Sequence, residues 1–106
     1  MRRACRSAAT VLDRLCAMVK PGMNTFEIDE AGGDLMKDMG IKSACKGYRS
    51  GHRVFPSYTC LSVNDEVVHG IGVREKVLHD GDIISVDVCI REDGFIGDNL
   101  SLIHIW

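Results

Sequence analysis

The sequence predicts an α+β domain in which two helices precede an antiparallel sheet. Residues 4–19 and 24–39 carry apolar side chains at the 3.6-residue spacing of amphipathic helices, whereas residues 83–90 alternate between apolar and polar side chains as a strand does. Helices followed by strands are typical of the α+β class. The chain has 106 residues, of which 45% are hydrophobic and 26% charged, and this composition is typical of one globular domain.

The first predicted helix covers residues 4–19. Its apolar face consists of Ala4, Cys5, Ala8, Leu12, Leu15 and Val19. The segment Lys20-Pro21-Gly22 ends this helix, because proline cannot continue a helix and glycine favours the turn that follows.

The second predicted helix begins at Asn24 or Thr25 and is capped by Gly40. Asn24, with Glu27 three residues later, has the form of a capping box. The apolar face continues through Ile28, Ala31, Leu35 and Met39. Gly32 and Gly33 each cost about 1 kcal/mol relative to alanine inside a helix, so we expect tertiary packing or a closely approaching element to compensate there.

Residues 46–72 are predicted to combine a loop, a strand and a second loop. Residues 46–56 are polar and contain glycine, which predicts a surface loop whose tip carries Arg49, Ser50 and Gly51. Residues 57–63 are β-prone, Asn64-Asp65 is a turn signal, and residues 66–72 lead into a loop.

The clearest predicted strand spans residues 83–90. One face carries Ile84, Val86, Val88 and Ile90, and the other carries Ser85, Asp87 and Cys89. This alternation predicts a strand with one buried face.

Charge and cysteine usage exclude several classes of protein. The formal net charge is −2 and no run of Lys or Arg exists, which argues against binding nucleic acid or an anionic membrane. No stretch approaches 18 consecutive apolar residues, so no membrane span is predicted. The basic start at residues 1–6 is not followed by an apolar segment, so no secretory signal is predicted. The expected compartment is therefore the cytosol. The cysteines form an odd set without a CxxC pair and are interpreted as reduced thiols. They are Cys5, Cys16, Cys45, Cys60 and Cys89.

A β-hairpin is predicted after residue 90, because Asp93-Gly94 lies between apolar strands. A turn centred between Glu92 and Asp93 gives these cross-strand partners: Arg91 with Gly94, Cys89 with Ile96, and Asp87 with Asp98. Opposed Cβ atoms lie about 4.5–5.5 Å apart, so the two carboxylates would repel each other unless a cation lay between them. Such a pair can hold two divalent ions about 3.5–4 Å apart, which is the arrangement that activates water for hydrolysis. A bulge at Gly94 would shift this register by one residue.

Two other interpretations of the aspartates remain open. In one, Asp98 belongs to an exposed turn over residues 97–99 and Asp87 binds backbone amides. In the other, the two carboxyl groups share a proton. The metal hypothesis is favoured because Asp87 interrupts a strongly apolar strand, where a charge must be paired, protonated or bound to a metal.

The histidines carry less information. His69 follows two valines and precedes Gly70, so it is either a structural histidine at a strand end or a hydrogen-bonding group for a peptide substrate, a role that suits a side chain titrating near neutral pH. His79 is interpreted as a turn residue and His52 as loop surface.

Four motifs in order resemble the type I methionine aminopeptidases. They are residues 20–23 (KPGM) with 27–29 (EID), 60–71 (CLSVNDEVVHGI), 81–88 (GDIISVDV) and 93–98 (DGFIGD). The resemblance covers nearly the whole chain up to Asn99, and several linked motifs are far more specific than any one of them.

The resemblance implies a pita-bread (creatinase/aminopeptidase-like) metallopeptidase, of which this chain is the N-terminal half, an antiparallel sheet with covering helices. In that family two aspartates, one histidine and two glutamates hold two divalent ions, with a bridging water or hydroxide as the nucleophile. Asp87 and Asp98 match the two aspartates, and His69 matches the histidine that contacts the substrate near the scissile amide. The wall of the methionine pocket is matched by Cys45, Tyr48, Phe55 and Cys60, since sulfur and aromatic contacts suit a thioether. For Cys45 and Cys60, plain core packing remains an alternative.

The resemblance also implies cofactors and partners. The cofactors are two divalent metal ions, and the oxygen-rich ligands suit Fe²⁺, Mn²⁺, Co²⁺ or Zn²⁺. The partners are the N-terminal peptides of nascent proteins, met at the ribosome, without direct binding to nucleic acid or membrane. The full-length protein is expected to be a cytoplasmic monomer that removes the initiator methionine.

The chain departs from the family pattern after Asn99. The family's ligand histidine and two ligand glutamates lie in a C-terminal half that this chain lacks, so we expect residues 1–99 to be inactive by themselves. Residues 100–106 resemble the in-frame translation of a transposase adapter and are interpreted as an artefactual tail. Without the other half of the sheet, the strand from Ile83 is expected to expose an apolar face and an unpaired edge, which favours aggregation.

Two rival functions remain open. One is another pita-bread peptidase, such as an Xaa-Pro dipeptidase, which shares the aspartate pair but not residues 60–71 as written. The other is a non-catalytic binding protein on the same fold, which would keep the core and lose the metal ligands.

Overall fold

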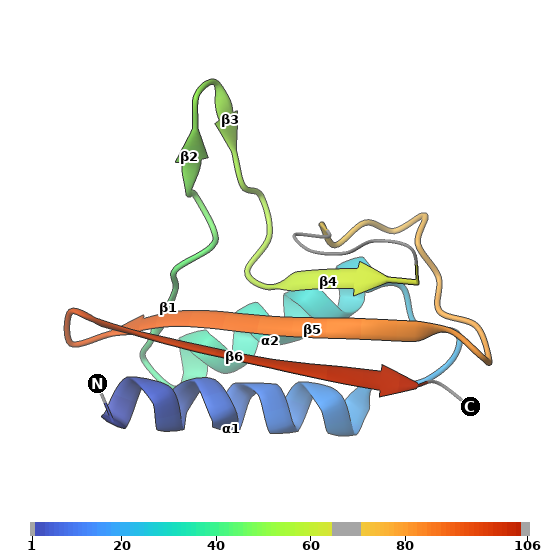
Figure 1. Cartoon of the computed structure of the whole chain (residues 1–106), viewed down its shortest axis with the longest axis horizontal. Helices are drawn as coiled ribbons and strands as arrows, with labels where there is room; N and C mark the ends of the chain where they lie inside the picture. Colours follow the sequence, from blue (N-terminus) through green and yellow to red (C-terminus); the bar gives the residue numbers. More distant parts are fainter. Residues whose placement is uncertain (1, 65–70, 105–106) are drawn as a thin grey trace.

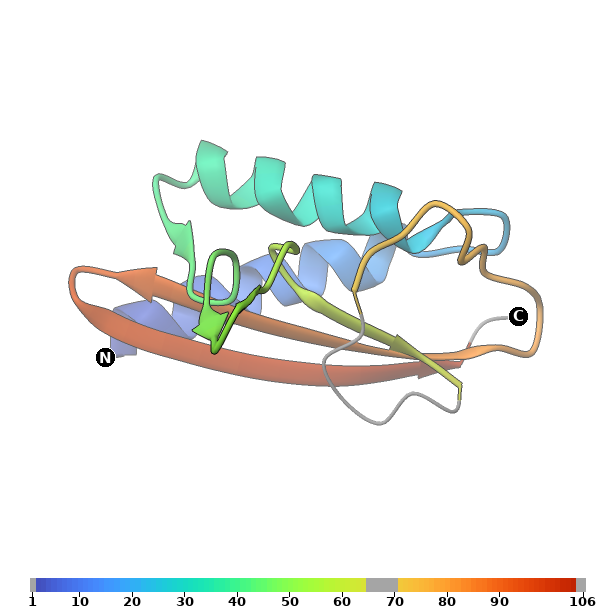
Figure 2. The same cartoon turned by 90° about the horizontal axis from the view of Figure 1, so that it is seen from above.

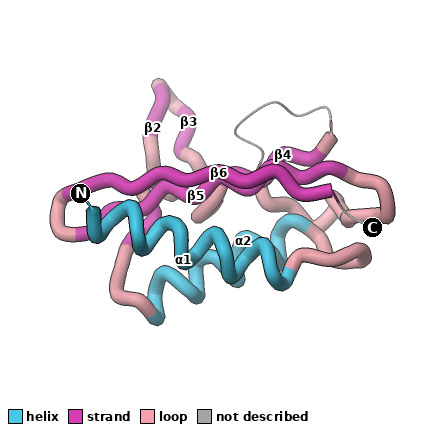
Figure 3. Tube along the Cα trace, turned by 60° about the horizontal axis from the view of Figure 1, so that its bottom comes forward, coloured by secondary structure: helices cyan, strands magenta, loops and turns pink. Residues whose placement is uncertain are grey.

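Two helices pack on one face of an antiparallel sheet in the computed structural model, which describes residues 2–64 and 71–104 (Figures 1 and 3). The helices are α1 (Arg2–Met18) and α2 (Thr25–Asp38). The sheet contains β1 (Lys42–Ser43), β4 (Cys60–Val63), β5 (Ile83–Glu92) and β6 (Phe95–His104). β5 is the central strand, with β1 and β4 along one edge and β6 along the other. The predicted α+β class is confirmed.

A small hairpin projects from the sheet on the side away from the helices (Figure 1). It consists of β2 (Arg49–Ser50) and β3 (Arg53–Val54), joined through Gly51, whose φ is +64°. The sequence predicted only a surface loop here, and that prediction missed the two strands. Because Arg49 pairs with Val54, the turn of this hairpin lies at residues 51–52 and includes Gly51, which was predicted at the tip of the loop.

Both predicted helices are present, and the predicted capping box is confirmed. The Asn24 side chain accepts a hydrogen bond from the backbone N–H of Glu27 at 2.8 Å, and the Glu27 carboxylate accepts one from the backbone N–H of Asn24. Gly40, with φ of +71°, follows the end of α2. The close approach expected at the glycine pair also exists, because a Cβ on Gly33 would lie 2.6 Å from the Tyr58 ring.

The core lies between the helices and the inner face of the sheet. α1 contributes apolar side chains at helical spacing, and β5 contributes every second side chain. All of them are fully or almost fully buried. The buried members of α1 and β5 are Ala4, Ala8, Val11, Leu12, Leu15, Ile84, Val86, Val88 and Ile90. Because Val86 and Val88 face the helices, Asp87 between them faces the opposite side of the sheet.

The strand predicted over residues 57–63 is shorter, beginning at Cys60. Tyr58 and Thr59 do not join the ladder, because their backbone N–H groups donate to the buried Asp29 carboxylate of α2 at 3.0 and 2.8 Å. Asn64, with φ of +52°, has the conformation expected of the predicted turn. Its neighbour Asp65 and most of the predicted loop over 66–72 lie outside the described residues.

The predicted hairpin exists, but its predicted register is wrong by two residues. Asp93 and Gly94, with φ of +52° and +80°, are themselves the two turn residues, so Glu92 pairs with Phe95. Cys89 is therefore opposite Asp98, and Asp87 is opposite Leu100, where the sequence analysis paired Cys89 with Ile96 and Asp87 with Asp98. Positive φ at both central residues matches the right-handed twist of the strands, which is why Asp-Gly occupies the turn itself. There is no bulge at Gly94.

β6 continues through Leu100 to His104 and carries several exposed apolar side chains. Phe95, Ile96, Leu100 and Leu102 are 50%, 52%, 55% and 68% exposed. The apolar face and unpaired edge expected on the strand from Ile83 are not found there. β5 is paired along both edges and its apolar face is buried against the helices, so the exposed apolar side chains lie on β6 instead. Within residues 2–64 and 71–104, no helix has the length and apolar character needed to cross a membrane.

Gly97 lets β6 lie directly against the first turn of α1. A Cβ at this position would lie 2.5 Å from the carbonyl carbon of Ala4 and 2.9 Å from the backbone nitrogen of Cys5. Both neighbours are backbone atoms of a helix, so neither can rotate away as a side chain could.

We therefore expect Gly97→Ala to lower the free energy of unfolding of the chain by about 2 kcal/mol through overpacking. Urea unfolding followed by circular dichroism measures this change. Leu100→Ala on the same strand is the matched control, because the Leu100 side chain is exposed and its loss is expected to change stability by less than about 0.5 kcal/mol. Equal stability of the Gly97 variant and the control would contradict the close contact.

Candidate functional site

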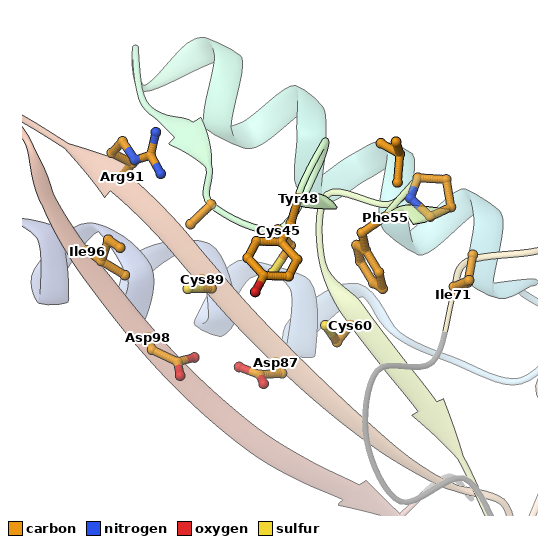
Figure 4. Close-up of a pocket in the computed structure, with 13 residues that line it drawn as sticks. Cys45, Tyr48, Phe55, Cys60, Ile71, Asp87, Cys89, Arg91, Ile96 and Asp98 are labelled. Atoms are coloured by element: carbon orange, nitrogen blue, oxygen red, sulfur yellow. The ribbon is translucent and has the colours of Figure 1, made fainter. Parts of the chain in front are cut away.

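The two predicted aspartates lie on the same face of the β5–β6 ribbon, away from the helices. A shift of two residues preserves the face of every side chain, so the corrected register makes Asp87 and Asp98 diagonal neighbours. Figure 4 shows their carboxyl groups pointing toward each other across the ribbon. The sequence prediction of a shared face holds, although the prediction of direct opposition does not.

The environment of Asp87 disfavours a charged carboxylate. The side chain is half-buried, and the described residues offer no hydrogen-bond partner to its buried Oδ1 atom. Burial, followed by a hydrogen bond to Asp98 that requires a proton and by repulsion from that carboxylate, raises the pKa of Asp87 to about 7. Burial and the neighbouring Asp98 thus favour the protonated form of Asp87, and proton sharing between the two carboxyl groups stays an open interpretation beside cation binding.

The same face opens into a cavity of about 700 Å³. The four residues predicted for the pocket wall, Cys45, Tyr48, Phe55 and Cys60, all line it together with Asp87 and Asp98 (Figure 4). The other lining residues are Ala44, Val54, Pro56, Ile71, Cys89, Arg91 and Ile96. A largely apolar wall with a pair of acids at one side suits a substrate that has an apolar side chain beside a polar group.

Local hydrogen bonds hold three of the wall residues in place. Phe55 donates its backbone N–H to the carbonyl oxygen of Tyr48 at 2.8 Å, and Tyr48 donates to the carbonyl of Cys45 at 3.0 Å. The Ser43 hydroxyl accepts from the backbone N–H of Cys45 at 3.1 Å and donates to the Tyr58 carbonyl at 2.6 Å. The segment that carries Cys45 and Tyr48 is thus tied both to the β2–β3 hairpin and to the approach to β4.

The buried carboxylate of Asp29 fixes the position of β4. It is 5% exposed and accepts hydrogen bonds from the backbone N–H groups of Tyr58 and Thr59 and from the Thr59 hydroxyl at 2.7 Å. Three donors satisfy the charge without a cation. Because Cys60 follows directly, α2 determines where this part of the cavity wall lies.

Three cysteines come together in the cavity. The neighbouring Cys60 thiol, together with burial, raises the pKa of Cys45, and the Cys45 thiol lowers the pKa of Cys60. Burial raises the pKa of Cys89 to about 11, with smaller contributions from Cys45 and the two aspartates. All five cysteines are free thiols, as the sequence predicted.

Some site residues were missed by the sequence analysis. Cys89 and Arg91 follow Asp87 at intervals of two, so strand periodicity alone places them on the cavity face. Ile96 precedes Asp98 by two residues on the facing strand, and the same rule would have found it. Ile71 and the role of Asp29 depend on tertiary contacts, and no local signal in the sequence marks them.

Among the described residues, His52 and His79 do not line the cavity. His69 lies outside the described residues. His79 donates its backbone N–H to Asp82 at 2.9 Å in a turn, and His52 is exposed in the β2–β3 turn, as the sequence predicted for both.

The donor set fits part of a divalent-cation site. Two carboxylates, one with an orphaned buried oxygen, offer the oxygen ligands that hard and borderline ions accept. In the part of the chain that the structure describes, however, no three His, Cys, Asp or Glu side chains form a group that could hold a metal ion. The described residues therefore supply two ligands and would need others to complete a site.

Comparison with known proteins gives consistent matches along the chain. A sequence model of Metallopeptidase family M24 matches residues 1–104. The chain is 42% identical over 99 residues to the methionine aminopeptidase of Escherichia coli strain K12. This alignment covers 92% of this chain and 36% of that protein. The crystal structure of methionine aminopeptidase from Rickettsia prowazekii matches with a TM-score of 0.90 and 31% identity, over 98% of this chain and 40% of that chain.

A more distant match concerns the fold alone. Prolidase from Pyrococcus furiosus matches with a TM-score of 0.74 and 16% identity, over 96% of this chain and 27% of that chain. The architecture is thus part of the pita-bread fold that aminopeptidases and prolidases share. The chain spans 36 to 40% of the two methionine aminopeptidases described above.

The raised pKa of Asp87 predicts a pH-dependent stability in metal-free buffer. Between the usual pKa of 3.8 and about 7, the folded chain holds a proton that the unfolded chain has released, so stability falls as pH rises through this window. We expect urea unfolding with a chelator present to show this fall between pH 4.5 and 8. Asp87→Asn removes it, whereas Asp34→Asn on the exposed face of α2 leaves it unchanged. An unchanged pH profile in the Asp87 variant would refute the assignment.

Proposed function

The chain belongs to metallopeptidase family M24, and from this premise we propose that the protein containing it is a methionine aminopeptidase. The proposed reaction is the metal-dependent removal of the N-terminal methionine from nascent proteins in the cytoplasm. The single observation that carries the proposal is the pair Asp87 and Asp98 beside a cavity walled by sulfur and aromatic side chains.

Asp87 and Asp98 are the proposed metal ligands in this chain. Their oxygens, including the orphaned Oδ1 of Asp87, would bind two divalent ions, with Fe²⁺, Mn²⁺, Co²⁺ and Zn²⁺ as the candidates. Such ions supply Lewis acidity and lower the pKa of a water molecule for attack on an amide. The remaining ligands, one histidine and two glutamates, are proposed to come from residues beyond this chain, and for that reason we propose that the chain by itself is inactive.

The wall of the cavity is proposed to select the substrate side chain. Cys45 and Cys60 offer polarisable sulfur, and Tyr48 and Phe55 offer aromatic faces, so together they suit the flexible thioether of methionine. Phe55 and Tyr48 are linked through a backbone hydrogen bond across the base of the β2–β3 hairpin, which orients both rings on one side of the cavity. His69 is proposed to contact the peptide near the scissile amide.

The proposed partners follow from this chemistry. The substrate is the N-terminal peptide of a nascent protein, met at the ribosome, and neither nucleic acid nor a membrane is bound directly. The complete protein is proposed to act as a monomer.

The decisive experiment assays the complete protein that contains this chain. We expect it to release methionine from a Met-Ala-Ser peptide, to lose this activity with a chelator and to regain it with a divalent ion. Hydrolysis of an Xaa-Pro dipeptide instead would identify the prolidase alternative. No hydrolysis of either, together with other residue types in place of the expected histidine and two glutamates, would identify a non-catalytic binding protein.

Substitution of either aspartate tests the ligand assignment. Asp87→Asn and Asp98→Asn in the complete protein are each expected to weaken binding of the divalent ion at least about 100-fold, because an amide is a poorer and uncharged ligand. Isothermal titration calorimetry measures the affinity. Asp93→Asn is the matched control, since Asp93 lies in the turn of the same ribbon and outside the cavity. Equal metal affinity in all three variants would contradict the assignment.

A further inference from the structure

The cavity that holds the acid pair also contains a cation. Arg91 lines it four residues after Asp87 on β5, and strand alternation turns both side chains to the same face of the sheet. Four residues of strand advance about 13 Å, so Arg91 is set well apart from the acid pair along β5 (Figure 4). Among the described residues that line the cavity, Arg91 alone carries a positive charge.

No acidic side chain neutralises Arg91 in the part of the chain that the structure describes. Its cross-strand partner is Lys42 of β1, which is another exposed cation, and like charges directly opposite each other on neighbouring strands repel. Neither of these two residues forms an ion pair with a described acid, whereas the nearby Glu92 and Asp93 are paired with Arg3 of α1. Lys42 and Arg91 together therefore favour an anion from outside the chain.

The β2–β3 hairpin adds a second cation at the rim of the cavity. Arg49 is exposed and pairs with Val54, so their side chains share one face of the hairpin, and Val54 lines the cavity. Residues 39–64, which include this hairpin, contain four Lys or Arg residues and no Asp or Glu, although the whole chain has a formal net charge of −2. Positive charge is thus concentrated on the segment that forms one wall of the cavity.

We propose that Arg91 and Arg49 select peptides that carry an acidic side chain a few residues after their N-terminus. This inference rests on the proposed function, which places the first residue of a peptide in the cavity beside Asp87 and Asp98. An extended peptide advances about 3.3–3.6 Å per residue, so about four residues span the distance from Asp87 to Arg91. A carboxylate at the third to fifth position would then lie within reach of the Arg91 guanidinium group, which can donate two parallel N–H bonds to it.

An acidic peptide fits this cavity better than nucleic acid does. The wall between Arg91 and the acid pair is largely apolar, and the chain has no run of Lys or Arg that could follow a phosphate backbone. Asp87 and Asp98 would repel phosphate groups but attract the positive α-amino group of a peptide N-terminus. The charges of the cavity are therefore complementary to a peptide that is positive at its first residue and negative a few residues later.

The test compares two peptides, Met-Ala-Ser-Glu-Ser and Met-Ala-Ser-Gln-Ser, whose amidated C-termini leave the Glu side chain as the only difference in charge. Isothermal titration calorimetry measures their binding to the complete protein with a chelator present, so the result does not depend on hydrolysis. We expect the Glu peptide to bind at least about threefold more tightly, because ion pairs exposed to solvent contribute modestly. The preference should shrink as salt is raised, since salt screens such pairs.

Three variants assign the preference to its residues. Arg91→Glu should reverse it, so that Met-Ala-Ser-Lys-Ser amide binds more tightly than the Glu peptide, and the introduced carboxylate is tolerated opposite Lys42. Arg49→Gln should reduce the preference. Arg14→Gln is the matched control, because Arg14 is exposed on α1 at the other face of the sheet, and it should leave the preference unchanged.

Several results would overturn the inference. They are equal affinity for the Glu and Gln peptides, no binding of either peptide, an equal loss of preference in the Arg14 and Arg91 variants, and tighter binding of a short single-stranded RNA than of the Glu peptide. Failure of the proposed function has a different signature. In that case the preference for the Glu peptide is present, but the protein loaded with a divalent ion leaves both peptides intact.

Discussion

The turn at Asp93 and Gly94 is the constraint on which the carboxylate pair depends. Both residues have positive φ, so they form the two central positions of the hairpin and the pairing of β5 with β6 is fixed from Glu92 and Phe95 outward. That register places Asp98 opposite Cys89 and one step diagonally from Asp87, with every second residue turned to the cavity. Gly97, next to Asp98, then allows α1 to support the ribbon from behind. A different turn length would separate the acids or send one of them into the core.

The opposite wall of the cavity has its own anchor, which is the buried carboxylate of Asp29. Its three hydrogen bonds hold residues 58 and 59 against α2. The next residue, Cys60, begins β4 and pairs with Asp87 of β5. A carboxylate satisfied by donors from one short segment costs less to bury than one without partners. Asp29 and Asp87 illustrate the two cases: the first is a structural acid saturated with hydrogen bonds, and the second keeps a buried oxygen without any.

Local sequence signals predicted the helices well and the sheet register poorly, for physical reasons. The capping box, the proline and glycine stops and the apolar spacing act within a few residues, so α1 and α2 could be read directly from the sequence. Alternation in a strand has a period of two and specifies which face Asp87 shares with Asp98, but a slip of two residues leaves that pattern unchanged. The contacts of Asp29 with Tyr58 and Thr59 join residues about thirty positions apart, and no local pattern marks them. The wall formed by Cys45, Tyr48, Phe55 and Cys60 was predicted from family resemblance, while Cys89 could have been found from strand alternation alone.

The chemistry of the cavity follows from the cost of placing a charge on an otherwise apolar strand. At neutral pH, Asp87 is divided between its protonated and ionised forms, because burial and Asp98 hold its pKa at about 7. A cation bound by the same oxygens would have to displace that proton, so proton and cation compete for one position and cation binding strengthens as pH rises. The two aspartates supply only part of the coordination such an ion requires, since no third His, Cys, Asp or Glu joins them among the described residues. Burial on this face of the sheet therefore makes the ionised form of Asp87 unfavourable without a cation, and a cation bound by the same oxygens would stabilise that ionised form.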